Sequence, residues 1–383
     1  MDYKALGSLV DRKIGYGIVQ PGQNILDGVP VIKVNNLITG LHSKDELDVT
    51  TKENDEKYSR TRLKGGELIV SVVGTVGKTA IVPKSFRGCN LVRAVAMIDI
   101  KENWLSRWVK YYIDSPAGQA YIEQNLNTTV QATLNIKTLV DMPIPFPKED
   151  EMRKIVTILE AIDRKIECNQ QINDNLQQQA MALYAEMFLN SSNNDVTSGT
   201  LSDIAVITMG QSPSGSSYNE DGVGEVFYQG RAEFGFRFPK RRLFTTEPKR
   251  MAVAGDVLLS VRAPVGDLNM AYERCCIGRG LGAIHSKTGH SSFVLYTMFA
   301  LRSQLNVFNG EGTVFGSINR DALNAIPIDV PLVTKIDRFE AVAHPIDELI
   351  RTNYEENCRL EAIRNSLLPK LMSGEIDVSA IRL

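Results

Sequence analysis

The residues that most directly suggest chemistry lie in segment 74–79 (Gly-Thr-Val-Gly-Lys-Thr), which has the ending of a phosphate-binding P-loop. A P-loop also needs a glycine five positions before its Gly-Lys pair, and Val72 stands there. The similar segment 263–267 (Ala-Pro-Val-Gly-Asp) has neither the lysine nor the hydroxyl residue. We therefore interpret segment 74–79 as a turn between strands rather than as a nucleotide site.

Other side chains that often perform catalysis or bind metals are scattered along the chain. The four histidines show no His-Glu-x-x-His spacing, and the five cysteines show no Cys-x-x-Cys spacing. The chain also lacks a Gly-x-Ser-x-Gly turn, a glycine-rich dinucleotide loop and the Asn-Pro-Pro-aromatic stretch with which base-modifying methyltransferases hold a flipped adenine. The sequence therefore predicts a non-catalytic protein with no metal site and no cofactor.

Cationic and amide side chains suggest a second kind of chemistry, the binding of DNA. The formal net charge is only -2, but in segment 231–250 Lys and Arg outnumber the carboxylates. Charge runs often form only a solvated surface, whereas segment 234–242 (Phe-Gly-Phe-Arg-Phe-Pro-Lys-Arg-Arg) interleaves aromatics and glycine with its cations. Arg and Lys suit guanine edges, Asn and Gln suit adenine edges, and all four can hold phosphate. The predicted DNA-contacting residues are Lys33, Asn35, Arg60, Arg62, Lys78, Gln131, Gln229, Arg231, Lys240, Arg241, Arg242 and Arg262.

These residues must be positioned by two similar halves, because the chain repeats itself. Segment 66–71 (Gly-Glu-Leu-Ile-Val-Ser) returns 189 positions later as segment 255–260 (Gly-Asp-Val-Leu-Leu-Ser). Later landmarks return after 184 positions, as Asn135 does at Asn319. The halves differ most in the segments that carry many of the predicted contacts. A protein with two similar halves usually performs one task at two places.

The fold class predicted from this organisation is mixed α/β. We expect two similar α+β domains separated by two long antiparallel coiled-coil helices, with a pseudo-twofold internal repeat. Proline-punctuated segments end each domain at 142–147 and 326–331, because proline interrupts a helix. A polar run at 191–194 is expected to link the halves. The expected boundaries are 1–147 for the first domain, 148–190 for the first long helix, 191–331 for the second domain, and 332–383 for the second long helix and tail.

In the expected long helices, mostly apolar residues recur in steps of three and four, which indicates a seam between paired helices. The seam residues are Ile155, Leu159, Ile162, Ile166, Asn169, Asn173 and Leu176 in the first helix, and Ile346, Ile350, Asn353, Asn357 and Leu360 in the second. Antiparallel packing about position 171 would place Asn169 opposite Asn357 and Asn173 opposite Asn353. Such asparagine layers fix register at some loss of stability. Pro345 predicts a kink or a fresh start in the second helix.

Membrane insertion is not expected. The longest apolar stretches fall far short of the roughly 20 residues that a membrane helix needs, and the first residues (Met-Asp-Tyr-Lys) do not begin a signal peptide. We therefore expect a cytoplasmic protein.

Taken together, these features resemble the specificity subunit of type I restriction-modification systems. The resemblance rests on the repeated Gly-acid-aliphatic-aliphatic-Ser strands, the proline-punctuated domain ends, the duplicated long helices and segment 367–376 (Leu-Leu-Pro-Lys-Leu-Met-Ser-Gly-Glu-Ile). It implies two target recognition domains, each of which reads half of a bipartite site in double-stranded DNA, and the divergence between the two halves of the chain predicts that this site is asymmetric. It also implies helices that set the gap and dock two methyltransferase (modification) subunits. Methylation and cleavage would be supplied by those subunits and by restriction/translocase subunits.

Two other functions are compatible with parts of the sequence. A coiled-coil scaffold whose mixed domains bind proteins would also need two similar halves, but it would show no salt-dependent DNA binding. A nucleotide hydrolase would require Lys78 for turnover, and the incomplete P-loop argues against it.

Overall fold

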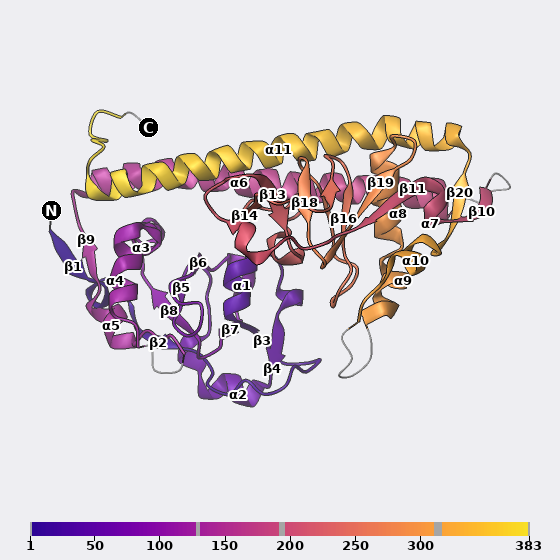
Figure 1. Ribbon diagram of the computed structural model, residues 1–383. Helices are drawn as coiled ribbons and strands as arrows, with labels where there is room; N and C mark the ends of the chain where they lie inside the picture. The colour runs from indigo at the N-terminus through magenta and orange to yellow at the C-terminus, as the bar shows by residue number, and fades with distance from the viewer. Residues whose placement is uncertain (1, 128–130, 191–195, 310–315, 382–383) are drawn as a thin grey trace. The chain divides into compact units, whose positions relative to one another are not determined.

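Residues 2–127, 131–190, 196–309 and 316–381 are described by the computed structural model (Figure 1). The chain forms two compact units: Met1–Ile166 with Cys358–Leu383, called unit 1, and Glu167–Asn357, called unit 2. The linker expected at 191–194 lies outside the described residues. In the described ranges, no helix is both long and apolar enough to cross a membrane.

Unit 1 is built around a four-stranded sheet with the strand order β2-β8-β5-β6, joined by a three-stranded sheet, β4-β3-β7, and a strand pair, β1-β9. The strands are β1 Tyr3–Ala5, β2 Arg12–Tyr16, β3 Val29–Ile32, β4 Asp48–Thr50, β5 Leu68–Ser71, β6 Thr79–Ile81, β7 Asn90–Leu91, β8 Val95–Asp99 and β9 Pro143–Pro145. The short helices are α1 Val34–Thr39, α2 Lys52–Lys57, α3 Asn103–Asp114, α4 Pro116–Gln124 and α5 Ile136–Asp141.

Strand β5 is apolar on both faces because it lies between two cores. Leu68 and Val70 pack in one core with Trp108 of α3, whereas Ile69 packs in the other with Ile32 of β3. Successive side chains of a strand point to opposite faces, so this continuous apolar run serves both cores at once. The same strand therefore holds α3 and the three-stranded sheet in place.

Unit 2 repeats this plan with a four-stranded sheet, β11-β19-β16-β17, a five-stranded sheet, β12-β14-β13-β18-β15, and a strand pair, β10-β20. The strands are β10 Val196–Thr200, β11 Ala205–Met209, β12 Tyr218–Asn219, β13 Glu225–Tyr228, β14 Leu243–Thr245, β15 Met251–Ala252, β16 Val257–Ser260, β17 Leu268–Met270, β18 Cys275–Ile277, β19 Leu281–Ser286 and β20 Pro327–Pro331. The short helices are α7 Leu201–Ile204, α8 Ser291–Ala300, α9 Arg302–Asn306 and α10 Arg320–Asn324. Strand β16 again serves two cores, with Val257 and Leu259 in one and Leu258 in the other. The mixed α/β fold expected from the sequence is confirmed.

The two long helices are α6, Glu149–Tyr184, and α11, Val333–Ser373 (Figure 1). In unit 2, Nδ2 of Asn169 donates to Oδ1 of Asn357, and Nδ2 of Asn353 donates to Oδ1 of Asn173, both over 2.8 Å. These are the asparagine pairs expected from an antiparallel seam. In unit 1, the first turns of α6 and the last turns of α11 share one core.

Every predicted seam residue is at least partly buried. The buried ones are Ile155, Leu159, Ile166, Asn169, Asn173, Ile350, Asn353 and Asn357, and the half-buried ones are Ile162, Leu176, Ile346 and Leu360. Helix α11 continues through Pro345, so the helix does not restart there. A proline deprives the helix of one N–H donor, and the buried neighbours Ala343 and Ile350 hold the turns on either side of it in the core.

An aspartate on each long helix connects that helix to the mixed domain of its unit. In unit 1, Asp163 of α6 accepts a hydrogen bond from the Tyr111 hydroxyl of α3 over 2.7 Å. In unit 2, Asp347 of α11 accepts one from the Tyr296 hydroxyl of α8 over 2.9 Å. Burial is the main cause that raises the pKa of both tyrosines, so each hydroxyl remains a donor at neutral pH.

Candidate nucleic-acid interface

The repeated Gly-acid-aliphatic-aliphatic-Ser motif builds the scaffold of each unit. Ser71 Oγ donates to the Thr75 carbonyl over 2.6 Å and accepts from the Lys78 amide over 2.8 Å. Ser260 Oγ makes the same two bonds, to the Pro264 carbonyl over 2.8 Å and from the Asp267 amide over 2.9 Å. Segment 74–79 therefore closes the turn between β5 and β6, as the sequence predicted.

The carboxylate of the motif's acidic residue also accepts hydrogen bonds from backbone amides. Glu67 accepts hydrogen bonds from the Lys64 and Gly65 amides over 2.6 and 2.8 Å. Asp256 accepts one from the Val253 amide over 2.9 Å. Because both carboxylates serve the turn before the central strand, the repeat marks structure, and the groups that contact a ligand must be sought elsewhere. Within the described ranges, no group of three or more His, Cys, Asp or Glu is placed to hold a metal ion.

Five of the predicted DNA-contacting cations form ion pairs within the protein. Lys33 pairs with Asp48, Arg62 with Asp55 and Glu56, Arg231 with Asp267, Arg241 with Glu273, and Arg242 with Glu233 and Glu220. Hydrogen bonds that Arg62, Arg241 and Arg242 donate to these carboxylates raise the pKa of the three arginines above the ordinary arginine value. The arginines stay charged, but much of their charge is already balanced.

These ion pairs differ in how deeply their carboxylates are buried. Asp55 and Glu233 are buried, and Asp55 also accepts a hydrogen bond from Asn90 over 2.8 Å. Arg62 and Arg242 therefore stabilise the fold through a buried carboxylate, which would be left uncompensated without them. Exposed pairs such as Lys33–Asp48 contribute little to stability, so Lys33 remains available to a phosphate.

The other predicted cations and amides are exposed. They are Asn35, Arg60, Lys78, Gln131, Gln229, Lys240 and Arg262. No ion pair is found for Arg60, Lys78, Lys240 or Arg262 among residues 2–127, 131–190, 196–309 and 316–381. These four side chains have both the charge and the exposure that a contact with DNA requires.

One arginine of the basic segment is buried instead of exposed. Arg237 has only 3% of its surface accessible. Its guanidinium donates to Asp347 of α11 over 2.6 Å and to Gln177 of α6 over 3.0 Å. Its charge therefore attaches the loop of the mixed domain to the long helices within unit 2 and is unavailable to DNA.

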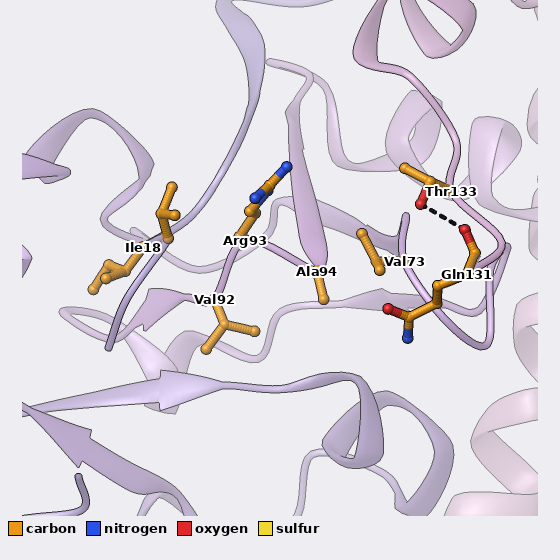
Figure 2. Close-up of a pocket in the computed structure, with 8 residues that line it drawn as sticks. Ile18, Val73, Val92, Arg93, Ala94, Gln131 and Thr133 are labelled. Atoms are coloured by element: carbon orange, nitrogen blue, oxygen red, sulfur yellow. Dashed lines mark hydrogen bonds between the residues drawn. The ribbon is translucent and has the colours of Figure 1, made fainter. Parts of the chain in front are cut away.

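Unit 1 has an open cavity of about 380 Å³ beside the end of β7. Figure 2 shows Ala94 and Val73 lying between Arg93 and Gln131 in this view. The wall of the cavity is mainly apolar, and none of the lining residues that the structure describes is acidic. These residues are Ile18, Val19, Val73, Val92, Arg93, Ala94, Gln131 and Thr133. Of these, only Gln131 was predicted from the sequence as a DNA contact.

Arg93 was missed because it lies outside any charge run. Its position is set by two backbone contacts: its amide donates to the Ile18 carbonyl over 2.8 Å, and the preceding Val92 amide donates to the Ile32 carbonyl over 3.1 Å. The only local signal was a cation two residues after the short buried strand β7. Its approach to Ile18 is a long-range contact that no sequence window contains.

The equivalent place in unit 2 follows from the strand registers. Leu91 pairs with Ile32 in unit 1 as Ile277 pairs with Tyr228 in unit 2, so Arg279 takes the place of Arg93. Bridges from Val73 to Thr133 and from Arg262 to Ser317 make Arg262 the equivalent of Val73. The same backbone framework therefore carries different side chains in the two units.

Comparisons with known proteins show which family the chain resembles. The family model of the type I restriction modification DNA specificity domain matches residues 21–178. The putative type I restriction enzyme MjaX specificity subunit of Methanocaldococcus jannaschii is 27% identical over 379 residues, which cover 92% of this chain and 88% of that protein. The chain is similar to type I restriction-modification specificity subunits over most of its length.

A second relative from the same family and a solved structure are also similar to the chain. The type I restriction enzyme EcoBI specificity subunit of Escherichia coli is 30% identical over 152 residues, which cover 39% of this chain and 32% of that protein. The solved type-I restriction-modification S subunit from M. genitalium has a TM-score of 0.53 at 16% identity and covers 96% of this chain and 95% of its own. At this identity the structural likeness supports the fold alone.

Proposed function

We propose that this chain is a specificity subunit, which recognises a DNA sequence within a type I restriction-modification complex, with each unit reading one half of an asymmetric bipartite target. The proposal rests on one observation: the two units share a backbone framework but carry different side chains at equivalent positions of it. Lys33 in unit 1 follows β3 as Gln229 in unit 2 follows β13, and Val73 corresponds to Arg262. One framework with different side chains suits the reading of two different half-sites.

The asymmetry of the target follows from these exchanges. A lysine and a glutamine present different hydrogen-bonding groups, since lysine only donates whereas glutamine both donates and accepts. Base edges are distinguished by their order of donors and acceptors in the major groove. Two units that differ at equivalent positions would therefore read different base pairs.

The long helices are proposed to set the gap between the half-sites. Helix α6 has 36 residues, which at about 1.5 Å per residue correspond to roughly 54 Å. Buried asparagine pairs fix the register of paired helices, and the pairs in unit 2 are both hydrogen-bonded. A fixed register would give a fixed separation, which half-sites on duplex DNA require.

Catalysis and much of the grip on DNA are assigned in this proposal to partner subunits. A formal net charge of -2 is low for a chain that holds DNA alone. We therefore assign methylation to two modification subunits docked on the helices, and cleavage to restriction/translocase subunits. A cytoplasmic location, where such a complex meets DNA, belongs to the same proposal.

Salt-dependent binding tests this proposal against a protein-binding scaffold. The chain would be copurified with its methyltransferase partner and titrated onto duplex DNA at several salt concentrations. DNA recognition predicts specific binding by the complex and a steep fall in affinity with salt, because phosphate contacts release counterions. Complexes of normal composition with no salt-dependent affinity for any duplex would favour the scaffold.

A further inference from the structure

The end of β7 in unit 1 holds a cation in surroundings that suit a base edge. Arg93 is exposed, while the amides of Val92 and Arg93 are both hydrogen-bonded to neighbouring segments. No carboxylate forms an ion pair with Arg93 in the described part of the chain. Its guanidinium is therefore unneutralised and projects from a backbone that two segments hold in place.

The wall around Arg93 is neutral and largely apolar. Val73, Val92 and Ala94 line the same cavity, and the polar groups that complete it come from Gln131 and Thr133. A phosphate site typically gathers several cations or backbone amides, whereas a base edge offers an arginine two acceptors beside apolar surface. The arrangement in unit 1 corresponds to the second case, since Arg93 is the only cation among the described residues that line the cavity.

Unit 2 has an arginine at the same structural position. The Gly278 amide donates to the Tyr228 carbonyl over 2.8 Å, as Val92 does to Ile32, and the Arg279 amide donates to the Ser212 hydroxyl over 3.2 Å. Arg279 is exposed. An arginine thus follows the same strand in both units, although neither belongs to a charge run.

We propose that Arg93 and Arg279 are equivalent guanine-reading residues, one in each half of the DNA target. Each guanidinium would donate two hydrogen bonds to the O6 and N7 acceptors of a guanine in the major groove. Arg262, which replaces Val73, would add a second cation in unit 2 only. This inference rests on the proposed function, and it requires a G·C pair in each half-site.

The test is the adenine-methylation motif in cells that carry the full chain and its methyltransferase partner. Arg93→Lys keeps the positive charge but loses the planar fork that binds guanine bidentately. We expect it to relax one G·C position of the first half-site by about 5- to 150-fold and to leave the second half-site unchanged. Arg279→Lys should relax the second half-site only.

Arg87→Lys is the matched control, because Arg87 is an exposed arginine of unit 1 that does not line the cavity. It should leave both half-sites unchanged. Unaltered motifs in both Arg93→Lys and Arg93→Ala, with complexes of normal composition, would overturn the guanine-reading role while leaving the proposed function intact. A wild-type half-site without any G·C pair would overturn it as well. Absence of any bipartite motif in the wild type would instead contradict the proposed function, and this inference with it.

Discussion

Asn169 of α6 and Asn357 of α11 are joined by a hydrogen bond of 2.8 Å, and both side chains are buried. The amide of Asn169 also donates to Glu356 over 2.8 Å. Four residues along α6, Asn173 accepts from Asn353 in the same way. Two consecutive polar layers in an otherwise apolar contact define how the helices are aligned, because any slip would leave these buried amides without partners.

Asn169→Ala should lower the thermal stability of the full chain. The substitution removes both hydrogen bonds of a fully buried amide, and we expect this to lower the free energy of unfolding by about 1–3 kcal/mol. Gln170→Ala, at the exposed neighbouring position of the same helix, is the matched control and should change the melting temperature little. Equal melting temperatures for the two variants would show that the asparagine layer contributes no stability.

Asp347→Asn should destabilise unit 2 more than Asp163→Asn destabilises unit 1. Asp347 balances the charge of Arg237, whose side chain is almost entirely buried. Leaving a buried charge without its partner lowers the free energy of unfolding by about 3–5 kcal/mol. Asp163 pairs with Arg364, whose side chain is 32% exposed, so water can solvate that guanidinium. Denaturant unfolding of the two variants gives the comparison, and a larger loss for Asp163→Asn would contradict it.

Ser71→Ala should destabilise the fold, whereas Lys78→Ala should not. The Ser71 hydroxyl is buried and makes two side-chain hydrogen bonds within its turn. Their removal should lower the free energy of unfolding by about 1–3 kcal/mol. Lys78 is exposed and takes part in that turn through its backbone amide and carbonyl. Melting temperatures of both variants, with and without Mg-ATP, provide the measurement. A shift of the wild type by Mg-ATP that Lys78→Ala abolishes would restore the nucleotide-site interpretation.

Alkylation should distinguish the cysteines by burial. Cys168 and Cys358 are exposed, whereas Cys89, Cys275 and Cys276 are buried. Burial raises the pKa of the Cys275 thiol to about 12 and also raises that of Cys89, so their thiolates are scarce at pH 8. Iodoacetamide at that pH should modify Cys168 and Cys358 first, and all five cysteines only after unfolding. Peptide mass spectrometry would reveal early modification of Cys275, which would contradict this burial.

Much of the scaffold could be predicted from the sequence because its signals are local and repeated. The strand of 66–71 and the asparagines of the seam carry their periodicity in the chain itself, and the repeat doubles each signal. The continuity of α11 through Pro345 could not be predicted, because packing of the neighbouring turns on the core outweighs the loss of one hydrogen bond.

The candidate interface was less accessible to sequence reasoning because it depends on contacts between distant segments. Arg231, Arg241 and Arg242 form a basic run in sequence, but Asp267, Glu273 and Glu220 reach them only in the folded chain. Arg237 belongs to the same run and is buried against the long helices. Arg93, in contrast, has no basic neighbours in the sequence, but a long-range backbone contact with Ile18 holds it at an open cavity.

Genome-wide adenine methylation tests the central claim most directly. It would be mapped in cells that carry this chain with its methyltransferase partner and in matched cells that lack only this chain. The account predicts a methylated, asymmetric bipartite motif with an unread gap, which disappears when the chain is deleted. An unchanged set of methylated sites, with the partner present and active, would contradict the claim that this chain selects the target sequence.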